Sequence, residues 1–319
     1  MLKQEIEKRS SIIEKEMDKS IGLDEPEELY KASRHLLTAG GKRLRPVLAL
    51  ISAEAIEEDY RKILPSALAI EIIHNFTLIH DDIMDKDVMR RNAPTVHVKW
   101  NEPTAILAGD TLFAKAFEII TECDVEPENV VRATKMLADV CIKICEGQYL
   151  DMGFEKRKNI SEEEYINMVE RKTAVLIATA CSLPAVLLGK DKQIVDTLWN
   201  FGLASGTAFQ IHDDVLDVVG GDKIGKDWCS DIVEGKMTLI AIKAMEMGVD
   251  IGIFGKGNAD ESEKREVMEK LVSSGAIDYT REMAEDYLSK AKANLAVLEE
   301  TPARKLLEDI ADYLIYREY

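Results

Sequence analysis

Two short segments of the sequence carry the same cluster of carboxylates. The chain reads "IHDDIMD" at residues 79–85 and "IHDDVLD" at residues 211–217. On a helix, positions four residues apart share a face, so Asp81 and Asp85 point the same way, with Cβ atoms roughly 5–6 Å apart. Like charges at this spacing destabilise a helix by about 0.2–0.5 kcal/mol. Because this unfavourable arrangement occurs twice, we expect a positive ligand beside the clusters.

The residue types indicate what that ligand is. Neither cluster contains a cysteine or a pair of histidines at metal-binding spacing, and carboxylate oxygens favour a hard cation such as Mg²⁺. An EF-hand calcium loop is excluded, because "DDIMDKDVMRRN" lacks its glycine and its alternating ligand positions. Magnesium held by few carboxylates usually completes its shell with substrate phosphates. The clusters therefore predict a magnesium site for a phosphorylated substrate, with solvated helix ends as the alternative.

Each cluster continues a polar stripe along an otherwise apolar helix. His74 and Thr77 lie on the same face as Asp81 and Asp85. On the second helix, one line contains Gly202, Gly206, Gln210, Asp213 and Asp217. Since this line has carboxylates at one end and glycines at the other, we expect it to border a cavity with a charged mouth and an open floor.

Basic residues in two loops supply the second part of a phosphate site. "GGKRLRP" at residues 40–46 contains Lys42, Arg43 and Arg45, and "RRNAPT" begins with Arg90 and Arg91. Arginine is suited to bidentate contacts with oxyanions. Lys42 is not a Walker lysine, because Arg43 stands where that motif has Ser or Thr and the upstream glycine is missing. A solvated loop is the alternative for each basic group taken alone.

These residues must be positioned by helices. Helical periodicity dominates the chain, and no series of alternating residues indicates strands, so we predict an all-α protein. Leu2, Ile6, Ile13 and Met17 mark an opening amphipathic helix. Further helices are predicted, with a short one near the C-terminus, at 27–39, 46–57, 62–86, 104–121, 127–151, 161–187, 192–217, 234–247, 262–273 and 277–297.

Composition narrows the class of protein. The chain has 319 residues and a net charge of −18, which argues against binding to the phosphates of nucleic acid. No linker or low-complexity stretch divides it, so residues 1–319 are predicted to form a single domain. The N-terminus has no apolar core, and the apolar run at 173–189 is shorter than a membrane span. We therefore expect a soluble protein rather than a membrane protein.

The cysteines indicate the cellular compartment. The five cysteines are scattered, without a C-x-x-C pair. Cys141 and Cys145 stand one helical turn apart, and we expect both to be buried thiols. This usage predicts a reducing cytoplasm.

Taken together, the motifs resemble those of the trans-type isoprenyl diphosphate synthases, also called the polyprenyl synthetase family. The segments that carry the resemblance occur in the family's order over residues 40–240 and are GGKRLRP, DDIMD followed by RR and PTVH, GDTLFAKAF, GQYLDM, RKTAVL, FQIHDDVLD and GKDWCSDIVEGKMTL. The resemblance, closest to archaeal-type short-chain geranylgeranyl diphosphate synthases, implies a single-domain isoprenoid-synthase helical bundle with a central cavity. It also implies a homodimer that joins an allylic diphosphate head-to-tail to isopentenyl diphosphate.

The resemblance also implies a role for each matching residue. Asp81, Asp85 and Asp213 resemble catalytic ligands of a trinuclear Mg²⁺ cluster formed with the substrate diphosphate, and Asp217 resembles a supporting metal position, with Asp82 and Asp214. Lys172, Thr173 and Gln210 resemble catalytic residues, the last two placing oxygen dipoles near the nascent carbocation. The allylic diphosphate would contact Arg90, Lys172, Lys226 and Lys236. Isopentenyl diphosphate would contact Lys42, Arg45, His74 and Arg91.

Product length is implied by the residues before DDIMD. Phe76 stands five positions before Asp81, and Thr77 four positions before it. One aromatic residue at the earlier position, with no insertion in the acid motif, resembles the arrangement that accompanies the twenty-carbon product, geranylgeranyl diphosphate. Farnesyl diphosphate, alone or mixed with geranylgeranyl diphosphate, is the alternative product.

Two segments depart from the family pattern, at three positions. Asn92 replaces the usual glycine after the arginine pair, and we expect little change because asparagine tolerates a left-handed backbone. Trp228 and Cys229 replace small residues, which leaves the packing of that loop as a question for the structure.

Three other functions fit these motifs less well. An HD-type phosphohydrolase needs more histidine ligands than the five histidines and their spacing provide. A class I terpene cyclase usually has a second metal motif of a different type from DDVLD. A non-catalytic subunit of a heteromeric synthase typically loses one acid motif, whereas both are intact here.

Overall fold

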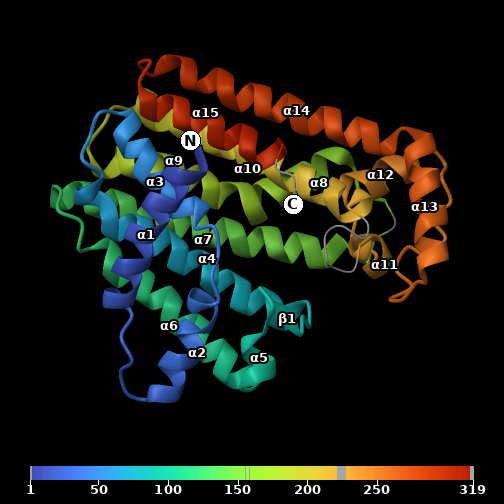
Figure 1. The fold of residues 1–319 in the computed structure, drawn as a ribbon, viewed down its shortest axis with the longest axis horizontal. Coiled ribbons are helices and arrows are strands. Elements are labelled where there is room, and N and C mark those ends of the chain that lie inside the picture. The colour runs from blue at the N-terminus through green and yellow to red at the C-terminus, as the bar shows by residue number, and fades with distance from the viewer. Residues whose placement is uncertain (1, 155, 158, 221–227, 317–319) are drawn as a thin grey trace. The chain divides into compact units, whose positions relative to one another are not determined.

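The computed structural model describes residues 2–154, 156–157, 159–220 and 228–316, and its regular structure is almost entirely helical (Figure 1). The all-α prediction is confirmed. The residues group into two compact units, each built from separate stretches of the chain. Unit 1 contains Met1–Cys141, Thr179–Leu198 and Val297–Leu307, and unit 2 contains Ile142–Ala178, Trp199–Ala296 and Glu308–Tyr319. The single-domain organisation of the chain stays a prediction.

Unit 1 is built around helix α4 (Leu64–Met84), which contacts helix α6 (Glu102–Ile120) over a longer stretch than any other helix pair in the unit. Helix α4 is apolar on nearly every side, as its fully buried Ile70, Ile72 and Ile73 indicate. Around this pair pack α1 (Leu2–Ser20), α2 (Glu27–Thr38), α3 (Leu44–Ala55) and the 3₁₀ turn Tyr60–Ile63. The central helix therefore carries the first acid motif out of a tightly packed core.

A small hairpin follows the first acid motif and was not predicted. Strands β1 (Met89–Arg90) and β2 (Ala93–Pro94) pair antiparallel, and the short helix α5 (Val96–Lys99) follows them. Arg91 and Asn92 form the two-residue turn with φ of 52° and 60°. Two positive φ angles in succession match the turn that suits the twist of a hairpin. Asn92 thus adopts the left-handed backbone expected of it.

Four helices have residues in both units, because the unit boundaries fall within them. They are α7 (Pro127–Phe154), α9 (Val175–Leu187), α10 (Lys192–Val219) and α15 (Pro302–Tyr316). Helix α15 is longer than the short C-terminal helix that was predicted.

The remaining elements belong mainly to unit 2. They are α8 (Glu162–Val169), the π-helical turn Glu170–Ala174, α11 (Ser230–Glu234), α12 (Leu239–Glu246), α13 (Glu261–Ser274), α14 (Ala276–Asn294) and the 3₁₀ turn Leu295–Val297. Helix α14 contacts both α12 and α13. Capping boxes begin α8 at Ser161 and α13 at Asp260. Two predictions were wrong in detail: the helix expected at 161–187 is interrupted by the π turn, and that expected at 234–247 begins only at Leu239 and misses α11.

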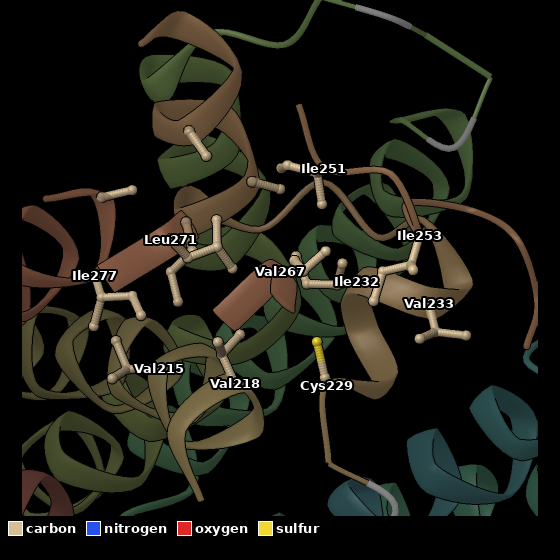
Figure 2. Packing of buried hydrophobic residues seen from close by; sticks show 14 of the residues in the cluster. Val215, Val218, Cys229, Ile232, Val233, Ile251, Ile253, Val267, Leu271 and Ile277 are labelled. Carbon is tan, nitrogen blue, oxygen red and sulfur yellow. The ribbon is translucent and has the colours of Figure 1, made fainter. Parts of the chain in front are cut away.

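Trp228 and Cys229 belong to the apolar core of unit 2. Cys229 points into a cluster with Val218, Ile232 and Val267 (Figure 2). The Trp228 indole is 7% exposed and its Nε1 donates to Glu261 Oε2 at 3.0 Å. Trp228 and Cys229, two of the residues that depart from the family pattern, are therefore anchors of this core, which accounts for their size.

Of the sequence-based predictions about buried residues, the one for Cys145 needs correction. Cys141 is buried as expected, but Cys145 is exposed, because it lies on the outer face of α7. The apolar run at 173–189 was predicted to be a buried helix, and residues 174–187 are indeed buried. The segment of the described residues that is long and apolar enough to cross a membrane is Tyr60–Met84. In its most apolar window 61% of the residues are buried within the protein, a property that core helices of soluble proteins share.

Candidate active site

The first acid motif lies at the C-terminal end of α4, and its three carboxylates have different surroundings. Asp81 is half-buried, Asp85 is exposed and Asp82 is fully buried. Arg90 Nε donates to Asp82 Oδ1, and Arg90 Nη2 to Asp87 Oδ2 at 3.1 Å. Burial raises the pKa of Asp82, and the nearby Arg90 opposes this shift. Asp82 thus works as an internal anchor for Arg90, while Asp81 and Asp85 share the outer face.

The hairpin turn attaches Arg91 to the glycine-rich loop. Arg91 Nη1 donates to the carbonyls of Leu36, at 2.9 Å, and Gly40, at 2.6 Å. Gly41 has a φ of 142°, and a Cβ placed there would lie 3.3 Å from Arg91 Cζ. The glycine therefore allows both the backbone conformation and the close approach of the guanidinium.

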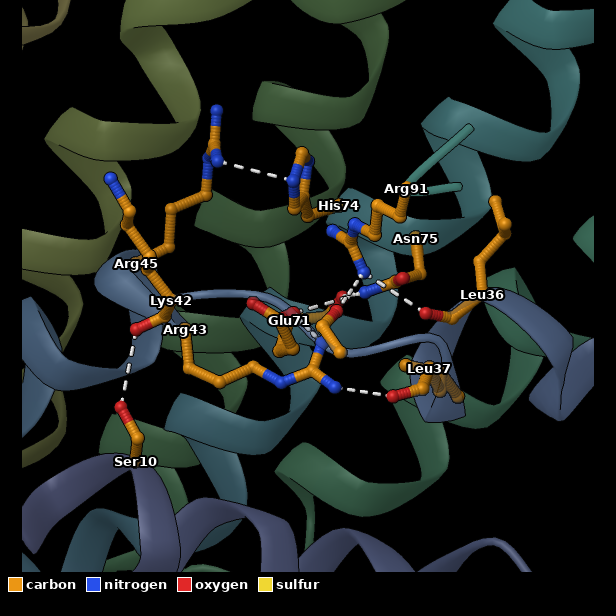
Figure 3. A network of polar contacts seen from close by, with 11 residues as sticks. Ser10, Leu36, Leu37, Lys42, Arg43, Arg45, Glu71, His74, Asn75 and Arg91 are labelled. Atoms are coloured by element: carbon orange, nitrogen blue, oxygen red, sulfur yellow. Dashed lines mark hydrogen bonds and ion pairs between the residues drawn. The ribbon is translucent and has the colours of Figure 1, made fainter. Parts of the chain in front are cut away.

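Figure 3 shows that Arg43 points away from the other two basic residues of the glycine-rich loop, Lys42 and Arg45. Arg45 Nη1 lies 3.2 Å from His74 Nε2, and the exposed Lys42 accepts a bond from Ser10 Oγ at its carbonyl. Arg43 turns inward and is 4% exposed. Its inclusion among the phosphate-binding cations of this loop was wrong, because its charge is already neutralised inside the protein.

The partner of Arg43 is a buried carboxylate on α4. Arg43 Nη1 and Glu71 Oε1 are 2.7 Å apart, and each side chain is 2% exposed. Asn75 Nδ2 also donates to Glu71 Oε1 at 3.1 Å, while Arg43 Nη2 donates to the Leu37 carbonyl. This network fastens the basic loop to the helix that carries the first acid motif.

His74 is held neutral in a defined tautomer. Arginine donates hydrogen bonds and accepts none, so His74 Nε2 accepts from Arg45 and the ring proton lies on Nδ1. Burial, followed by the charges of Arg45 and other nearby arginines, holds the pKa of His74 well below its usual value. The ring therefore positions Arg45 without adding a positive charge.

The carboxylates of the second acid motif, on α10 in unit 2, also differ in how deeply they are buried. Asp213 is half-buried, whereas Asp214 is 6% exposed. Asp217 accepts from Ser230 Oγ at Oδ1, 2.7 Å away, and from the Asp231 backbone N–H at Oδ2, 3.1 Å away. Asp217 therefore joins α10 to the start of α11. Its role as a metal ligand stays a prediction, and both of its oxygens already accept hydrogen bonds.

The π-helical turn places the next group of predicted residues. Thr173 Oγ1 donates to Gln210 Oε1 at 3.0 Å, and Gln210 Nε2 donates to Asp214 Oδ1 at 3.0 Å. Lys172 Nζ forms an ion pair with Asp151 of α7 at 2.5 Å. Isolated π turns within α-helices occur frequently at functional sites. The sequence did not reveal this one, because its residue types are compatible with an ordinary α-helix.

Glycines let neighbouring helices approach this turn closely. A Cβ at Gly147 would collide with the backbone of Lys172, and one at Gly206 would lie 2.7 Å from Ala174 Cα. Gly202 makes the same kind of approach to Ala178, at 2.6 Å. The open floor expected beside Gly202 and Gly206 was wrong, because the backbone of the neighbouring helix occupies that space.

The lysines predicted downstream are only partly described. Lys236 Nζ lies 3.4 Å from Asp231 Oδ1 and 3.0 Å from Glu234 Oε2. Lys226 lies outside the described residues.

The residues predicted to set product length belong to an aromatic cluster. The Phe76 ring lies 5.2 Å from that of Phe113, which lies 5.0 Å from that of Phe117. Thr77 Oγ1 donates to the His74 carbonyl at 2.8 Å. Sequence reasoning missed Phe113 and Phe117, although their spacing of four residues within GDTLFAKAF places both on one face of α6.

Carboxylate oxygens are the candidate metal ligands of the predicted site. Within the part of the chain that is described, no group of three or more His, Cys, Asp or Glu side chains converges as a metal-binding cluster. The half-buried and exposed carboxylates of α4 and α10 offer oxygen atoms, which suit Mg²⁺ when a diphosphate and water supply the remaining ligands. The carboxylates of each helix, taken by themselves, therefore fit ligands of a substrate-assisted magnesium ion.

An all-α fold with two aspartate helices, each accompanied by basic residues, defines a class of enzymes that handle diphosphates. A model of the polyprenyl synthetase family matches residues 26–271, and the chain belongs to that family. It is 54% identical over 319 residues to a geranylgeranyl pyrophosphate synthase of Geoglobus acetivorans, with 100% of both chains covered.

Solved structures give the same result. A geranylgeranyl pyrophosphate synthetase from Geoglobus acetivorans matches with a TM-score of 0.94 and 54% identity, covering 98% of this chain and 99% of that one. A polyprenyl synthase from Caulobacter crescentus, complexed with calcium and isoprenyl diphosphate, matches with a TM-score of 0.88 and 32% identity, covering 99% and 97%.

Proposed function

We propose that the protein is a short-chain trans-prenyltransferase that condenses isopentenyl diphosphate with dimethylallyl, geranyl and farnesyl diphosphates. Each condensation releases pyrophosphate, and geranylgeranyl diphosphate is the main product. The observation that carries the proposal is that both aspartate motifs are intact and end apolar helices, in a chain that matches a geranylgeranyl pyrophosphate synthase over its full length.

Magnesium would be held by Asp81, Asp85 and Asp213, with a diphosphate and water completing its shell. When bound, it supplies Lewis-acid stabilisation of the leaving diphosphate. Arg90, anchored by Asp82, and the lysines at 172 and 236 add positive charge where negative charge develops. A trinuclear arrangement of the ions, and roles for Asp217 and Lys226, are part of this proposal.

Isopentenyl diphosphate would bind to the basic group of unit 1. Lys42 is exposed, and Arg45 is oriented by the neutral His74. Arg91 uses Nη1 for two carbonyls, which leaves other N–H groups of its guanidinium to reach an oxyanion. Thr173 and Gln210 would turn oxygen atoms toward the allylic carbocation. No side-chain nucleophile is required, because the double bond of isopentenyl diphosphate attacks the allylic carbon once its bond to the diphosphate has broken. The cation that results loses a proton to the departing pyrophosphate, which restores a double bond.

The reaction is tested by incubating the protein with radiolabelled isopentenyl diphosphate, each allylic diphosphate and Mg²⁺. We expect label in prenyl diphosphates of up to twenty carbons. Three outcomes would contradict the proposal. Release of phosphate without labelled prenyl products would support a phosphohydrolase, and cyclised hydrocarbons would support a terpene cyclase. Activity that appears only with a second protein would support a non-catalytic subunit.

Replacing Phe76 by alanine should lengthen the product. The Phe76 ring packs against Phe113 and sits one turn before the acid motif, so its removal should open space for further isoprene units, whereas overfilling a packed site costs about 1–3 kcal/mol. Thr77→Phe should shorten the product for the same reason. Chromatography of dephosphorylated products measures both changes. Leu78→Ala, on another face of α4, is the control, and an unaltered distribution in Phe76→Ala would place the limit on another helix.

The protein is also proposed to be a homodimer. Ile142, Cys145, Tyr149 and Met152 follow one another on α7 at helical spacing and are all exposed, Tyr149 to 79%. A second copy would cover such an apolar stripe. We expect sedimentation equilibrium at micromolar concentration to give twice the chain mass, and Ile142→Glu with Tyr149→Arg to give the monomer. A wild-type protein that is monomeric and fully active would refute the dimer.

Location and remaining partners complete the proposal. All five cysteines are thiols, which supports a reducing cytoplasm. The net charge of −18 supports the absence of nucleic-acid binding, and the burial of the apolar segment Tyr60–Met84 supports a protein that is not inserted in a membrane.

A further inference from the structure

A buried tyrosine outside the predicted site is connected to it by hydrogen bonds. Tyr165 lies on α8 and is 1% exposed. Its hydroxyl donates to Asp214 Oδ2 at 2.5 Å. Gln210 Nε2 donates to the other oxygen of the same carboxylate, and Thr173 Oγ1 donates to Gln210 Oε1. Four side chains thus form one continuous chain of hydrogen bonds within unit 2.

We propose that Tyr165 is a positioning residue for prenyl transfer, which orients the amide of Gln210, and through it the hydroxyl of Thr173, by bonding to Asp214. This inference rests on the proposed function, because it assigns a purpose to the oxygens of Gln210 and Thr173.

The two bonds to Asp214 fix the direction of the rest of the chain. Asp214 accepts at both oxygens, from the Tyr165 hydroxyl at Oδ2 and from the Gln210 amide nitrogen at Oδ1. The oxygen of the amide must then face away, toward Thr173. If the amide were rotated by half a turn, its oxygen would face a carboxylate oxygen and both would lose a hydrogen-bond partner.

The consequence for Thr173 is electrostatic. Its hydroxyl proton is committed to Gln210 Oε1, so the lone pairs of Thr173 Oγ1 are what the hydroxyl presents to other groups. Oxygen lone pairs held in place before the reaction stabilise a developing positive charge without reorganisation. Tyr165 therefore sets the polarity of the dipoles that would act on the allylic carbocation, although it does not itself touch the substrate.

The burial of Asp214 supports a role beyond packing. A buried carboxylate is costly to desolvate, and well-packed apolar residues would be as stable or more stable in its place. Here both carboxylate oxygens receive a donor, one from α8 and one from its own helix. This arrangement specifies an orientation rather than merely filling space.

The test compares two tyrosines of the same unit. Tyr165→Phe removes only the hydroxyl that bonds Asp214, and Tyr279→Phe removes a hydroxyl that donates to Glu162 Oε2 at 2.7 Å, away from the predicted residues. For Tyr165→Phe we expect kcat to fall roughly tenfold, the loss of one well-oriented interaction, while both KM values stay within about twofold because no substrate contact is removed. Tyr279→Phe should retain the wild-type kcat.

A double-mutant cycle separates positioning from general destabilisation. Once Gln210→Ala has removed the amide, Tyr165 has nothing to orient, so adding Tyr165→Phe should lower kcat no further. Asp214→Asn provides a second variant of the same shape, in which the side chain no longer accepts at both positions, and it should lower kcat at least as much as Tyr165→Phe. Circular dichroism of each variant checks that the helices are retained.

The outcomes are distinct. A wild-type kcat in Tyr165→Phe or in Asp214→Asn, or an undiminished effect of Tyr165→Phe in the Gln210→Ala background, would overturn the inference. If wild type and Tyr279→Phe both fail to incorporate isopentenyl diphosphate, the proposed function fails instead.

Discussion

Replacing Asp81 or Asp213 by alanine is expected to lower kcat by roughly a thousandfold or more, because the metal-assisted departure of a diphosphate is worth several kcal/mol and each 1.4 kcal/mol is tenfold in rate. The two residues lie on different helices, α4 and α10, and each is half-buried at the polar end of an apolar helix. If both motifs serve one diphosphate, the loss of either should abolish most of the activity. The side chains are not core residues, so the fold should survive.

The measurement is steady-state turnover at saturating magnesium, with circular dichroism on the same samples. Asp196→Ala is the matched control, because Asp196 is an exposed aspartate on α10 that forms an ion pair with the exposed Lys192. Near-normal turnover of either Asp81→Ala or Asp213→Ala would refute a shared role of the two motifs.

Replacing Glu71 by alanine is expected to reduce the free energy of unfolding by about 3–5 kcal/mol, since it leaves the Arg43 guanidinium buried without its counter-ion. Arg43 and Glu71 are each 2% exposed, so water cannot solvate the remaining charge. Asn75 loses an acceptor in the same change. For a protein whose total stability is about 5–15 kcal/mol, this is a large fraction.

Urea unfolding followed by circular dichroism measures the loss. Glu266→Ala removes the partner of the exposed Lys270 and should leave the stability almost unchanged, because an exposed ion pair is screened by water. The double variant Glu71→Leu with Arg43→Met should be more stable than Glu71→Ala, because no charge remains buried. A loss no larger than that of Glu266→Ala would show that the pair is solvated in solution.

Many of the helices could be predicted from the sequence, because the residues on the buried face of a helix are apolar and recur every three to four positions. The apolar spacing of Ile6, Ile13 and Met17 predicts α1, and all three are buried. The hairpin at Met89–Pro94 was missed because two-residue strands leave no periodic pattern. Its turn residues Arg91 and Asn92 include no glycine, which would have been the usual signal for this turn.

The residue types of the site could be predicted from the sequence. Which of those side chains are buried as anchors and which face outward could not. The sequence treats Asp81 and Asp82 as neighbours in one motif, whereas the structure buries Asp82 against Arg90. The direction in which Arg43 points was equally hidden, because it depends on Glu71, twenty-eight residues away. Such partnerships arise from tertiary packing, which a local pattern does not record.

The backbone contact at Gly147 has a practical consequence for anyone who wishes to redesign the product. Because the main chain of α7 touches the main chain at Lys172 with only hydrogen atoms between them, position 147 accepts no other amino acid without moving the turn that carries Lys172 and Thr173. A library of variants selected for new product lengths should therefore keep the glycine at position 147. The positions to vary are the three phenylalanines of α4 and α6, Phe76, Phe113 and Phe117. There the neighbours are side chains, which are able to repack around a substitution.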